Sequence, residues 1–151
     1  MPTAPITSAA PAAIPAHLLP ALAACGKAPS PTVQALDPWC RPTGAGAPTA
    51  GCYLTLTANT DDRLVSVTTP LAASVQIHST SMEGGVMRMR EHDHGLPLPR
   101  DRAYAFKAGA DHLMLIAPTR ALTEGETVPL TLTFEKAPPV TVQATVRLTV
   151  P

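Results

Sequence analysis

Apolar and polar side chains alternate along most of the chain from Val33 onward, the pattern of β-strands that bury one face. The longest alternating segments are 52–57, 128–134 and 140–150. Shorter segments with the same period are 64–68, 74–78, 86–90, 103–106 and 112–116. No segment keeps a convincing helical spacing over about ten residues. The pattern predicts an all-β domain of many short strands, arranged as an antiparallel sandwich or barrel.

Turn-forming residues separate these segments and define where each strand should stop. They lie at 59–62, 83–85, 95–99, 109–111, 124–126 and 138–139. We therefore expect the strand at 74–78 to end at His78, and the proline-containing segment 95–99 to be a turn. Residues 33–151 are long enough to fold alone as one domain.

The first 32 residues lack this pattern and are expected to lie outside the fold. Residues 1–31 hold seven of the 18 prolines and one charged residue, Lys27. The apolar run 17–25 is shorter than the roughly 20 residues that span a bilayer. It ends in Leu-Ala-Ala-Cys, which resembles a bacterial lipobox with Cys25 as the lipidated residue. No Lys or Arg precedes this run, so a disordered Ala/Pro-rich segment remains the alternative to an export or lipoprotein signal.

Composition and charge narrow the choice of partners. The 11 basic and 11 acidic residues give a formal net charge of zero, which argues against a nucleic-acid partner and against electrostatic attraction to a membrane. Contact with a membrane is therefore expected only through a lipid anchor. Aromatic residues make up only 3% of the chain, so the core must be mainly aliphatic.

Two cysteines, Cys40 and Cys52, remain for the domain if Cys25 belongs to an export segment. The residues between them are rich in Gly, Pro and Thr and are typical of a loop. A disulfide between Cys40 and Cys52 fits an exported protein, and two separate buried thiols are the alternative. Neither cysteine has a CxxC partner, so we do not expect a thiolate metal site or a redox motif.

Histidine and methionine are concentrated in one part of the domain. Four of the five His and four of the five Met lie between His78 and Met114. Alternation places His112 and Met114 on one face of their strand, and Leu113 and Leu115 on the other. The leucines are the natural core residues, so His112 and Met114 should share the second face.

The segment 86–90 shows the same separation. Met87 and Met89 share one face, and two arginines occupy the other. These residues are consistent with a His/Met metal site. The alternative is that methionine fills gaps in a core poor in aromatics, as we expect for Met82, and that the histidines are ordinary surface residues.

Such a site would bind few kinds of metal ion. Thioether is a soft, neutral ligand that favours Cu(I). Only the imidazoles titrate, so the affinity should fall below about pH 6. Without a Cys thiolate a blue-copper electron-transfer centre is disfavoured. Carboxylates are too few for Ca(II) or Mg(II), and Zn(II) prefers other ligands than Met.

The order His78, Met89 and His112-Leu113-Met114 resembles the His…Met…His-x-Met motif of the PCu(A)C-type periplasmic copper chaperones. The flanking text is similar to the family as well, in segments 37–41, 52–56, 62–64, 85–89, 96–99 and 122–134. The resemblance covers roughly residues 33–148. Cys40 and Cys52 are not part of the family pattern.

This resemblance implies a cupredoxin-like Greek-key β-sandwich that binds one Cu(I) through His78, Met89, His112 and Met114. Met87 lies on the same face as Met89, so strand alternation does not distinguish them as ligands. The family motif selects Met89. Family membership also implies export to the periplasm or cell envelope. It further implies delivery of copper to the CuA centre of cytochrome c oxidase subunit II, beside Sco-type copper proteins.

Two further histidines, His92 and His94, follow Met89 in an expected loop. With Met87 they are candidates for an accessory Cu(II) or transfer site, and solvated surface histidines are the alternative. The leading expectation is a Cu(I) carrier that is not an enzyme. A metal-free β-sandwich interaction module of the cell envelope is the competing hypothesis. A copper enzyme is disfavoured because no second metal cluster, Ser-His-Asp set or acid/base pair is discernible.

Overall fold

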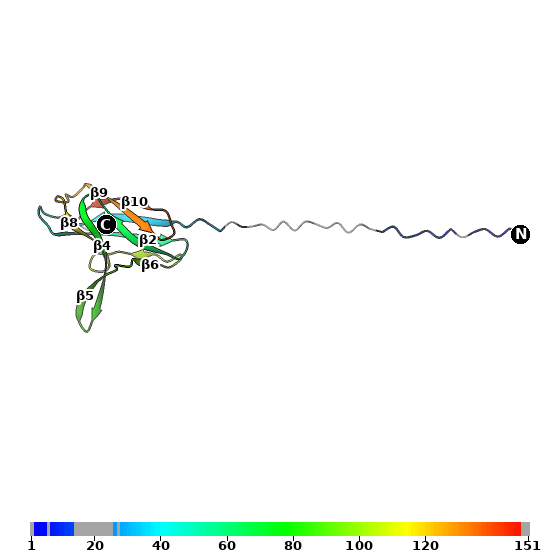
Figure 1. The fold of residues 1–151 in the computed structure, drawn as a ribbon, viewed down its shortest axis with the longest axis horizontal. Coiled ribbons are helices and arrows are strands. Elements are labelled where there is room, and N and C mark those ends of the chain that lie inside the picture. Colours follow the sequence, from blue (N-terminus) through cyan, green and yellow to red (C-terminus); the bar gives the residue numbers. More distant parts are fainter. Residues whose placement is uncertain (1, 6, 14–25, 27, 149–151) are drawn as a thin grey trace.

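The computed structural model describes residues 2–5, 7–13, 26 and 28–148 (Figure 1). The regular structure of this part is entirely β. The strands are β1 (Val33–Cys40), β2 (Thr49–Ala58), β3 (Asp62–Thr68), β4 (Ala72–Glu83), β5 (Val86–Glu91), β6 (Leu96–Leu98), β7 (Tyr104–Ala105), β8 (His112–Pro118), β9 (Thr127–Phe134) and β10 (Val140–Val146). Within the described residues, no helix is long and apolar enough to cross a bilayer.

The strands form one hydrogen-bonded path that folds back on itself. Its order is β5-β4-β8-β2-β1-β10-β9-β3-β6, and β7 pairs with β2 beside the path. The pair β1 and β10 is parallel, and the other neighbouring pairs are antiparallel. Strands far apart on the path, β3 and β4, also contact each other. The sheet therefore curls into a sandwich with the core between its layers (Figure 1).

The core is aliphatic, as the low aromatic content predicted. Its largest fully buried side chains, apart from two cysteines, are Leu56, Leu64, Leu98, Leu113, Leu115, Leu122, Leu130, Leu132, Val128 and Val146. Each such side chain stabilises the fold by about 1.5–3 kcal/mol relative to an exposed position. The predicted burial of Leu113 and Leu115 is confirmed.

Segment 95–99 is not only a turn, and the prediction is wrong for its centre. Leu96–Leu98 is the edge strand β6, in which Leu96 and Leu98 are buried and Pro97 is exposed. An edge strand tolerates proline because the missing N–H can lie on the side without a partner. The strand expected at 140–150 stops at Val146, and residues 149–150 lie outside the described part.

Strand β4 does not end at His78, as expected, but continues to Glu83. It turns back into β5 through Gly84 and Gly85, which have φ angles of 60° and 79°. Positive φ at both central residues is what a type I′ hairpin loop requires, and glycine adopts it without strain. The outer part of this hairpin projects from the body of the sandwich (Figure 1).

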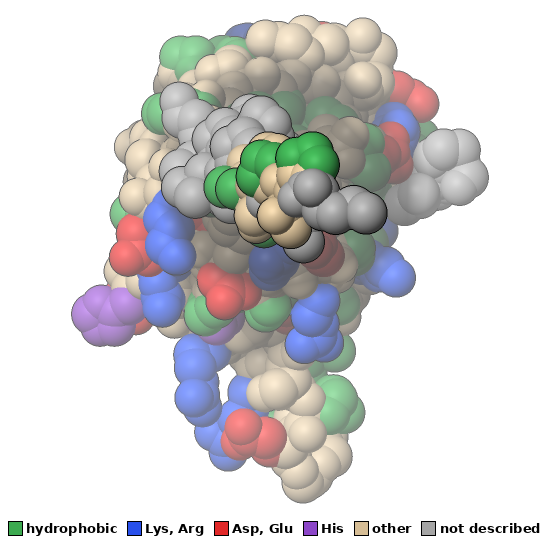
Figure 2. Space-filling view, turned by 90° about the vertical axis from the view of Figure 1, so that its right-hand side faces the viewer, with side chains coloured by type: hydrophobic (Ala, Val, Ile, Leu, Met, Phe, Trp, Pro, Cys, Tyr) green, Lys and Arg blue, Asp and Glu red, His purple; other side chains and the backbone are tan. Residues whose placement is uncertain are grey.

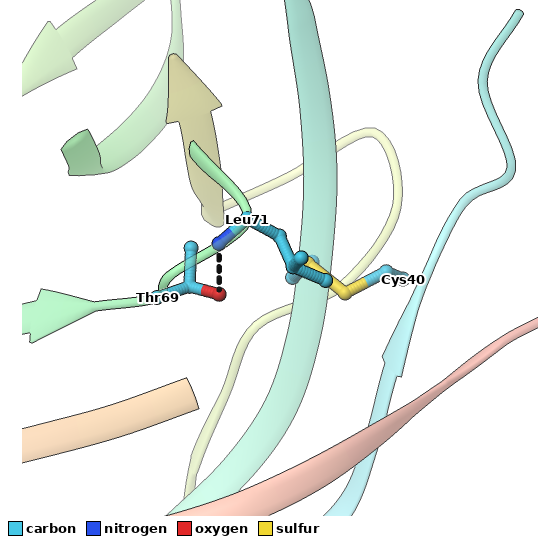
Figure 3. The surroundings of a disulfide bond; sticks show 4 residues. Cys40, Thr69 and Leu71 are labelled. Carbon is cyan, nitrogen blue, oxygen red and sulfur yellow. Dashed lines mark hydrogen bonds between the residues drawn. A yellow bond between two sulfur atoms is a disulfide. The ribbon is translucent and has the colours of Figure 1, made fainter. Parts of the chain in front are cut away.

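Cys40 of β1 and Cys52 of β2 are opposite each other and form a disulfide, with a Cα–Cα distance of 4.0 Å. Both are fully buried. Leu71, in the connection between β3 and β4, lies against the bond (Figure 3). Its backbone N–H donates to Thr69 Oγ1 at 3.3 Å, a hydrogen bond within this connection.

Candidate metal centre

Strand pairing brings the two histidines of the candidate motif together. His78 of β4 and His112 of β8 are direct cross-strand partners, and their ring centroids are 5.4 Å apart. The next pair on this face is Gln76 and Met114. Opposite residues in an antiparallel pair project to the same side of the sheet. His78, His112 and Met114 therefore share one face, while Leu113 of the same strand is buried on the other.

The hairpin adds methionines to this face. Met89 of β5 is opposite Thr80, and Met87 is opposite Met82. Thr80 follows His78 by two residues on the same face of β4, about 7 Å along the strand. Met89, opposite Thr80, therefore lies one step further along this face than His78. Met87 is two such positions away. The strand register therefore places Met89 nearer the histidine pair than Met87.

A cleft of about 370 Å³ lies on this face. Met87, Met89, His112 and Met114 line it, together with Thr80. His78 does not line the cleft, but it is half-buried beside His112 at its border. The structure thus gathers three of the four motif residues around one opening and sets the fourth next to it.

Hydrogen bonds orient both imidazole rings. His112 Nδ1 donates to the carbonyl oxygen of Ala110 at 2.9 Å, which leaves the Nε2 lone pair free. His78 Nε2 donates to Gln76 Oε1 at 3.0 Å, so the lone pair of His78 is on Nδ1. That Nδ1 atom is buried and has no hydrogen-bond partner. Buried polar atoms are normally paired, and a metal ion is one way to satisfy this nitrogen.

Electrostatics around His78 favour its neutral form. Burial lowers the pKa of His78, and the neighbouring His112 lowers this pKa further. His92 acts in the same direction, while the carboxylate of Glu91 raises the pKa. The net effect is a depressed pKa, so the imidazole is unprotonated near neutral pH. The unprotonated imidazole is the form that binds metals.

The turn before His112 is tied to β4. Thr80 donates its backbone N–H to Asp111 Oδ1 at 2.9 Å and its hydroxyl to the Ala110 oxygen at 3.1 Å. The Tyr104 hydroxyl donates to the other Asp111 oxygen. Burial, and then the bond to Asp111, raise the pKa of Tyr104. The sequence indicates Asp111 only as a turn residue, because its partners Thr80 and Tyr104 are distant along the chain and leave no local signal.

The other residues named from the sequence lie outside the cleft or outside the described part. The His92 N–H donates to the Ile77 oxygen at 2.8 Å, and the His94 oxygen accepts a bond from Arg63 Nη1 at 3.3 Å. Neither histidine lines the cleft. Cys25 lies outside the described residues.

The expectation that Met82 fills the core is wrong. This side chain is 65% exposed, because β4 extends beyond the body of the sandwich. Among the residues that the structure describes, no three His, Cys, Asp or Glu side chains form a metal-binding group. Any metal held here would therefore use thioethers beside the two imidazoles. That soft, uncharged donor set fits Cu(I), and it suits Zn(II), Ca(II) or Mg(II) poorly.

These features define a class of protein: a mainly antiparallel β-sandwich that presents His and Met side chains together on one sheet face. Comparison with protein families identifies the family. Residues 33–146 match the LpqE-like family, described as "Putative lipoprotein LpqE-like", and the chain belongs to this family.

Two relatives extend the comparison. The chain is 30% identical over 123 residues to the "Uncharacterized protein RP573" of Rickettsia prowazekii (strain Madrid E), covering 78% of this chain and 64% of that protein. It is 28% identical over 102 residues to the "Putative lipoprotein Lxx21020" of Leifsonia xyli subsp. xyli (strain CTCB07), covering 68% and 61%. The chain thus spans less than two thirds of the length of both relatives.

Solved structures agree with the family assignment. The copper-bound PCuAC domain from PmoF2 is 27% identical, with a TM-score of 0.64, covering 78% of this chain and 93% of that domain. The CuI-DR1885 solution structure from Deinococcus radiodurans is 28% identical, with a TM-score of 0.61 and 85% of each chain covered. These matches confirm the resemblance to PCu(A)C-type proteins and the cupredoxin-like β-sandwich.

Proposed function

We propose that this protein is a Cu(I)-binding metallochaperone of the cell envelope and that it is not an enzyme. One observation carries the proposal: the buried Nδ1 of His78 has no partner, and the His78 ring lies beside His112, which lines a cleft together with Met89 and Met114. Packing offers no reason to gather two imidazoles and two thioethers there. A soft monovalent metal does.

In this proposal His78 Nδ1, His112 Nε2 and the sulfurs of Met89 and Met114 hold the cargo. Gln76 and the Ala110 carbonyl keep the two rings in the required tautomers. All four ligands are uncharged, so no ligand anion has to be desolvated. The site lies on an open face, where an acceptor can replace the ligands one at a time.

The comparisons support the cargo and the compartment. The matched PmoF2 domain is described as copper-bound, and the DR1885 structure as a CuI form. The family and one relative carry lipoprotein names, which supports an envelope location with Cys25 as a candidate lipid attachment site. We further propose a periplasmic location and the CuA site of cytochrome c oxidase subunit II as the acceptor, with Sco-type proteins as partners.

The test is an anaerobic Cu(I) titration against a chromogenic chelator, followed by X-ray absorption. We expect one tightly bound Cu(I) per chain with both nitrogen and sulfur neighbours. The double change Met89→Leu/Met114→Leu should weaken this site strongly and leave the circular dichroism spectrum intact. Val86→Leu, on the opposite face of the same hairpin, is the matched control. Unchanged Cu(I) affinity in the double variant would exclude these ligands.

A metal-free interaction module is the second candidate, and the exposure of Met82, Met87 and Met89 favours it. It predicts that the protein takes no Cu(I) from the chelator. An enzymatic role would require copper-dependent turnover, and an oxidase assay of the loaded protein should detect none.

A further inference from the structure

Three methionines are exposed together on the hairpin, although only one of them belongs to the proposed ligand set. The side chains of Met82, Met87 and Met89 are 65%, 62% and 58% exposed. Met82 and Met87 are direct cross-strand partners, and Met89 is the next residue of β5 on the same face. Three exposed apolar side chains side by side have no packing role, and such patches usually mark an interaction site.

The hairpin geometry allows their sulfur atoms to meet. The loop Gly84-Gly85 makes Glu83 and Val86 the closing pair, so Met82 and Met87 form the next pair, which in such a hairpin is not hydrogen-bonded. Residues in such a pair have Cα atoms only about 4.5 Å apart, and the diagonal neighbour Met89 is within reach of long side chains. Methionine is unbranched and flexible, so three thioethers in this arrangement can converge on one ion.

Charges are placed on the other side of the hairpin. Arg88 and Arg90 alternate with the methionines and therefore project to the opposite face. The Arg88 Nε forms an ion pair with Glu83 Oε2 at 3.3 Å there. Figure 2 shows charged side chains on the hairpin, clear of the sandwich body. The guanidinium groups are thus directed away from the thioether face, where a cation would bind.

We propose that Met82, Met87 and Met89 form a second, outer site for a soft monovalent metal, through which Cu(I) reaches the inner site. This inference rests on the proposed function, because Met89 belongs to both ligand sets. Transfer is a ligand substitution. Bonds from Cu(I) to the Met82 and Met87 sulfurs break, bonds to His78 Nδ1, His112 Nε2 and the Met114 sulfur form, and Met89 stays bound. No electron is transferred, and the metal remains Cu(I).

The test uses protein labelled with ¹³C at the methionine methyl groups and titrated with silver nitrate, since Ag(I) is a soft monovalent ion without redox chemistry here. The first equivalent should shift the Met89 and Met114 methyl signals. The second, which finds Met89 already bound to the inner ion, should shift those of Met82 and Met87. Met82→Leu/Met87→Leu should abolish only the second event. Val86→Leu, which alters an exposed hairpin residue but no sulfur, should change neither.

Each outcome separates the two proposals. If Met82 and Met87 do not respond to the second equivalent, the outer site is refuted while the inner site stands. If Met89 and Met114 do not respond to the first equivalent, the proposed inner site fails, whether or not the other two methyl groups shift. Leucine preserves the apolar surface, so a patch that only docks a protein would leave silver binding unchanged in the double variant and would also overturn the inference.

A kinetic measurement tests the transfer itself. Cu(I) presented as a chelator complex should load the inner site about tenfold more slowly in Met82→Leu/Met87→Leu, equivalent to about 1.4 kcal/mol of barrier. The equilibrium affinity of the inner site should stay the same. An unchanged loading rate would show that the outer methionines are not on the path of the metal.

Discussion

The sandwich body and the β4–β5 hairpin follow the same alternating pattern, but they use it differently. In β9 every second residue is buried between the layers, whereas all six residues of β5 are exposed. Alternation in the body is explained by packing. Alternation in the hairpin separates thioethers from guanidiniums without burying either, so its residues call for a chemical explanation rather than a structural one.

Strand β8 combines core packing on one face with ligand residues on the other. Leu113 and Leu115 are fully buried, while His112 and Met114 face the cleft and are only partly buried. The two sides of one strand should therefore respond to substitution in opposite ways, which gives the most direct test of the comparison.

The largest effect is expected in the body. Leu113→Ala should lower the free energy of unfolding by about 3 kcal/mol, because it removes buried methyl groups and leaves a cavity. Met114→Leu should change stability by less than about 1.5 kcal/mol, since the volume is preserved, but should weaken Cu(I) binding. Urea denaturation and chelator competition on both variants measure this contrast. Equal loss of stability in the two variants would contradict it.

The disulfide should stabilise the body without affecting the metal site directly. Cys40→Ala/Cys52→Ala should lower the free energy of unfolding by about 3 kcal/mol, because the bond restricts the unfolded chain. Cu(I) affinity of the folded variant should stay close to that of the parent, since both sulfurs are buried on the core side of β1 and β2. Guanidinium unfolding of the parent and of the double variant, under non-reducing conditions, provides the comparison.

Asp62 should make the body sensitive to acid. Its carboxylate accepts backbone N–H bonds from Arg63, Lys136 and Ala137, between 2.8 and 2.9 Å. Burial alone would raise the pKa of Asp62, but these N–H groups and the charge of Lys136 bring it below its usual value. A lowered pKa in the folded state means that this stabilisation is present above about pH 3.9 and is lost as the pH falls through the folded pKa.

We therefore expect Asp62→Asn to cost about 2 kcal/mol at neutral pH and to flatten the fall in stability on acidification. Thermal unfolding between neutral pH and pH 3 checks both effects. A variant that keeps the parent's acid sensitivity would show that another carboxylate is responsible.

The smallest effect is expected in the hairpin. Gly85→Ala places a Cβ at a φ of 79° and should destabilise the turn by about 1 kcal/mol. The loss should be local, detected as faster amide hydrogen exchange in β5 with little change in global unfolding. Gly44→Ala, where an added Cβ meets nothing within 4 Å, is the control. Global destabilisation by Gly85→Ala would mean that the hairpin is part of the cooperative body.

Periodicity predicted much of the fold but not the extent of its elements. It located the strands at 52–57, 112–116 and 128–134, because each buries one face in the core. It failed at Leu96–Leu98, where Pro97 and the following Pro99 indicated a turn, but Leu96 and Leu98 are buried and form an edge strand. It also ended β4 five residues early, since the hairpin beyond His78 has no buried face to produce a hydrophobic signal.

The sequence predicted only part of the candidate site, for the same reason. Parity placed His112 with Met114, and Met87 with Met89, because these relations are local to a strand. The pairing of His78 with His112 and that of Met82 with Met87 join residues of different strands. Local periodicity contains no information about them.

The sequence by itself determined the strand periodicity, the aliphatic core and the concentration of His and Met in one segment, and its motif indicated the family. These depend on side-chain identity and on the two-residue period of a strand. Only the tertiary structure decided which strands are neighbours and in what register. That choice depends on the packing of the whole sandwich, and it sets the two imidazoles against each other and leaves three thioethers exposed on a projecting hairpin.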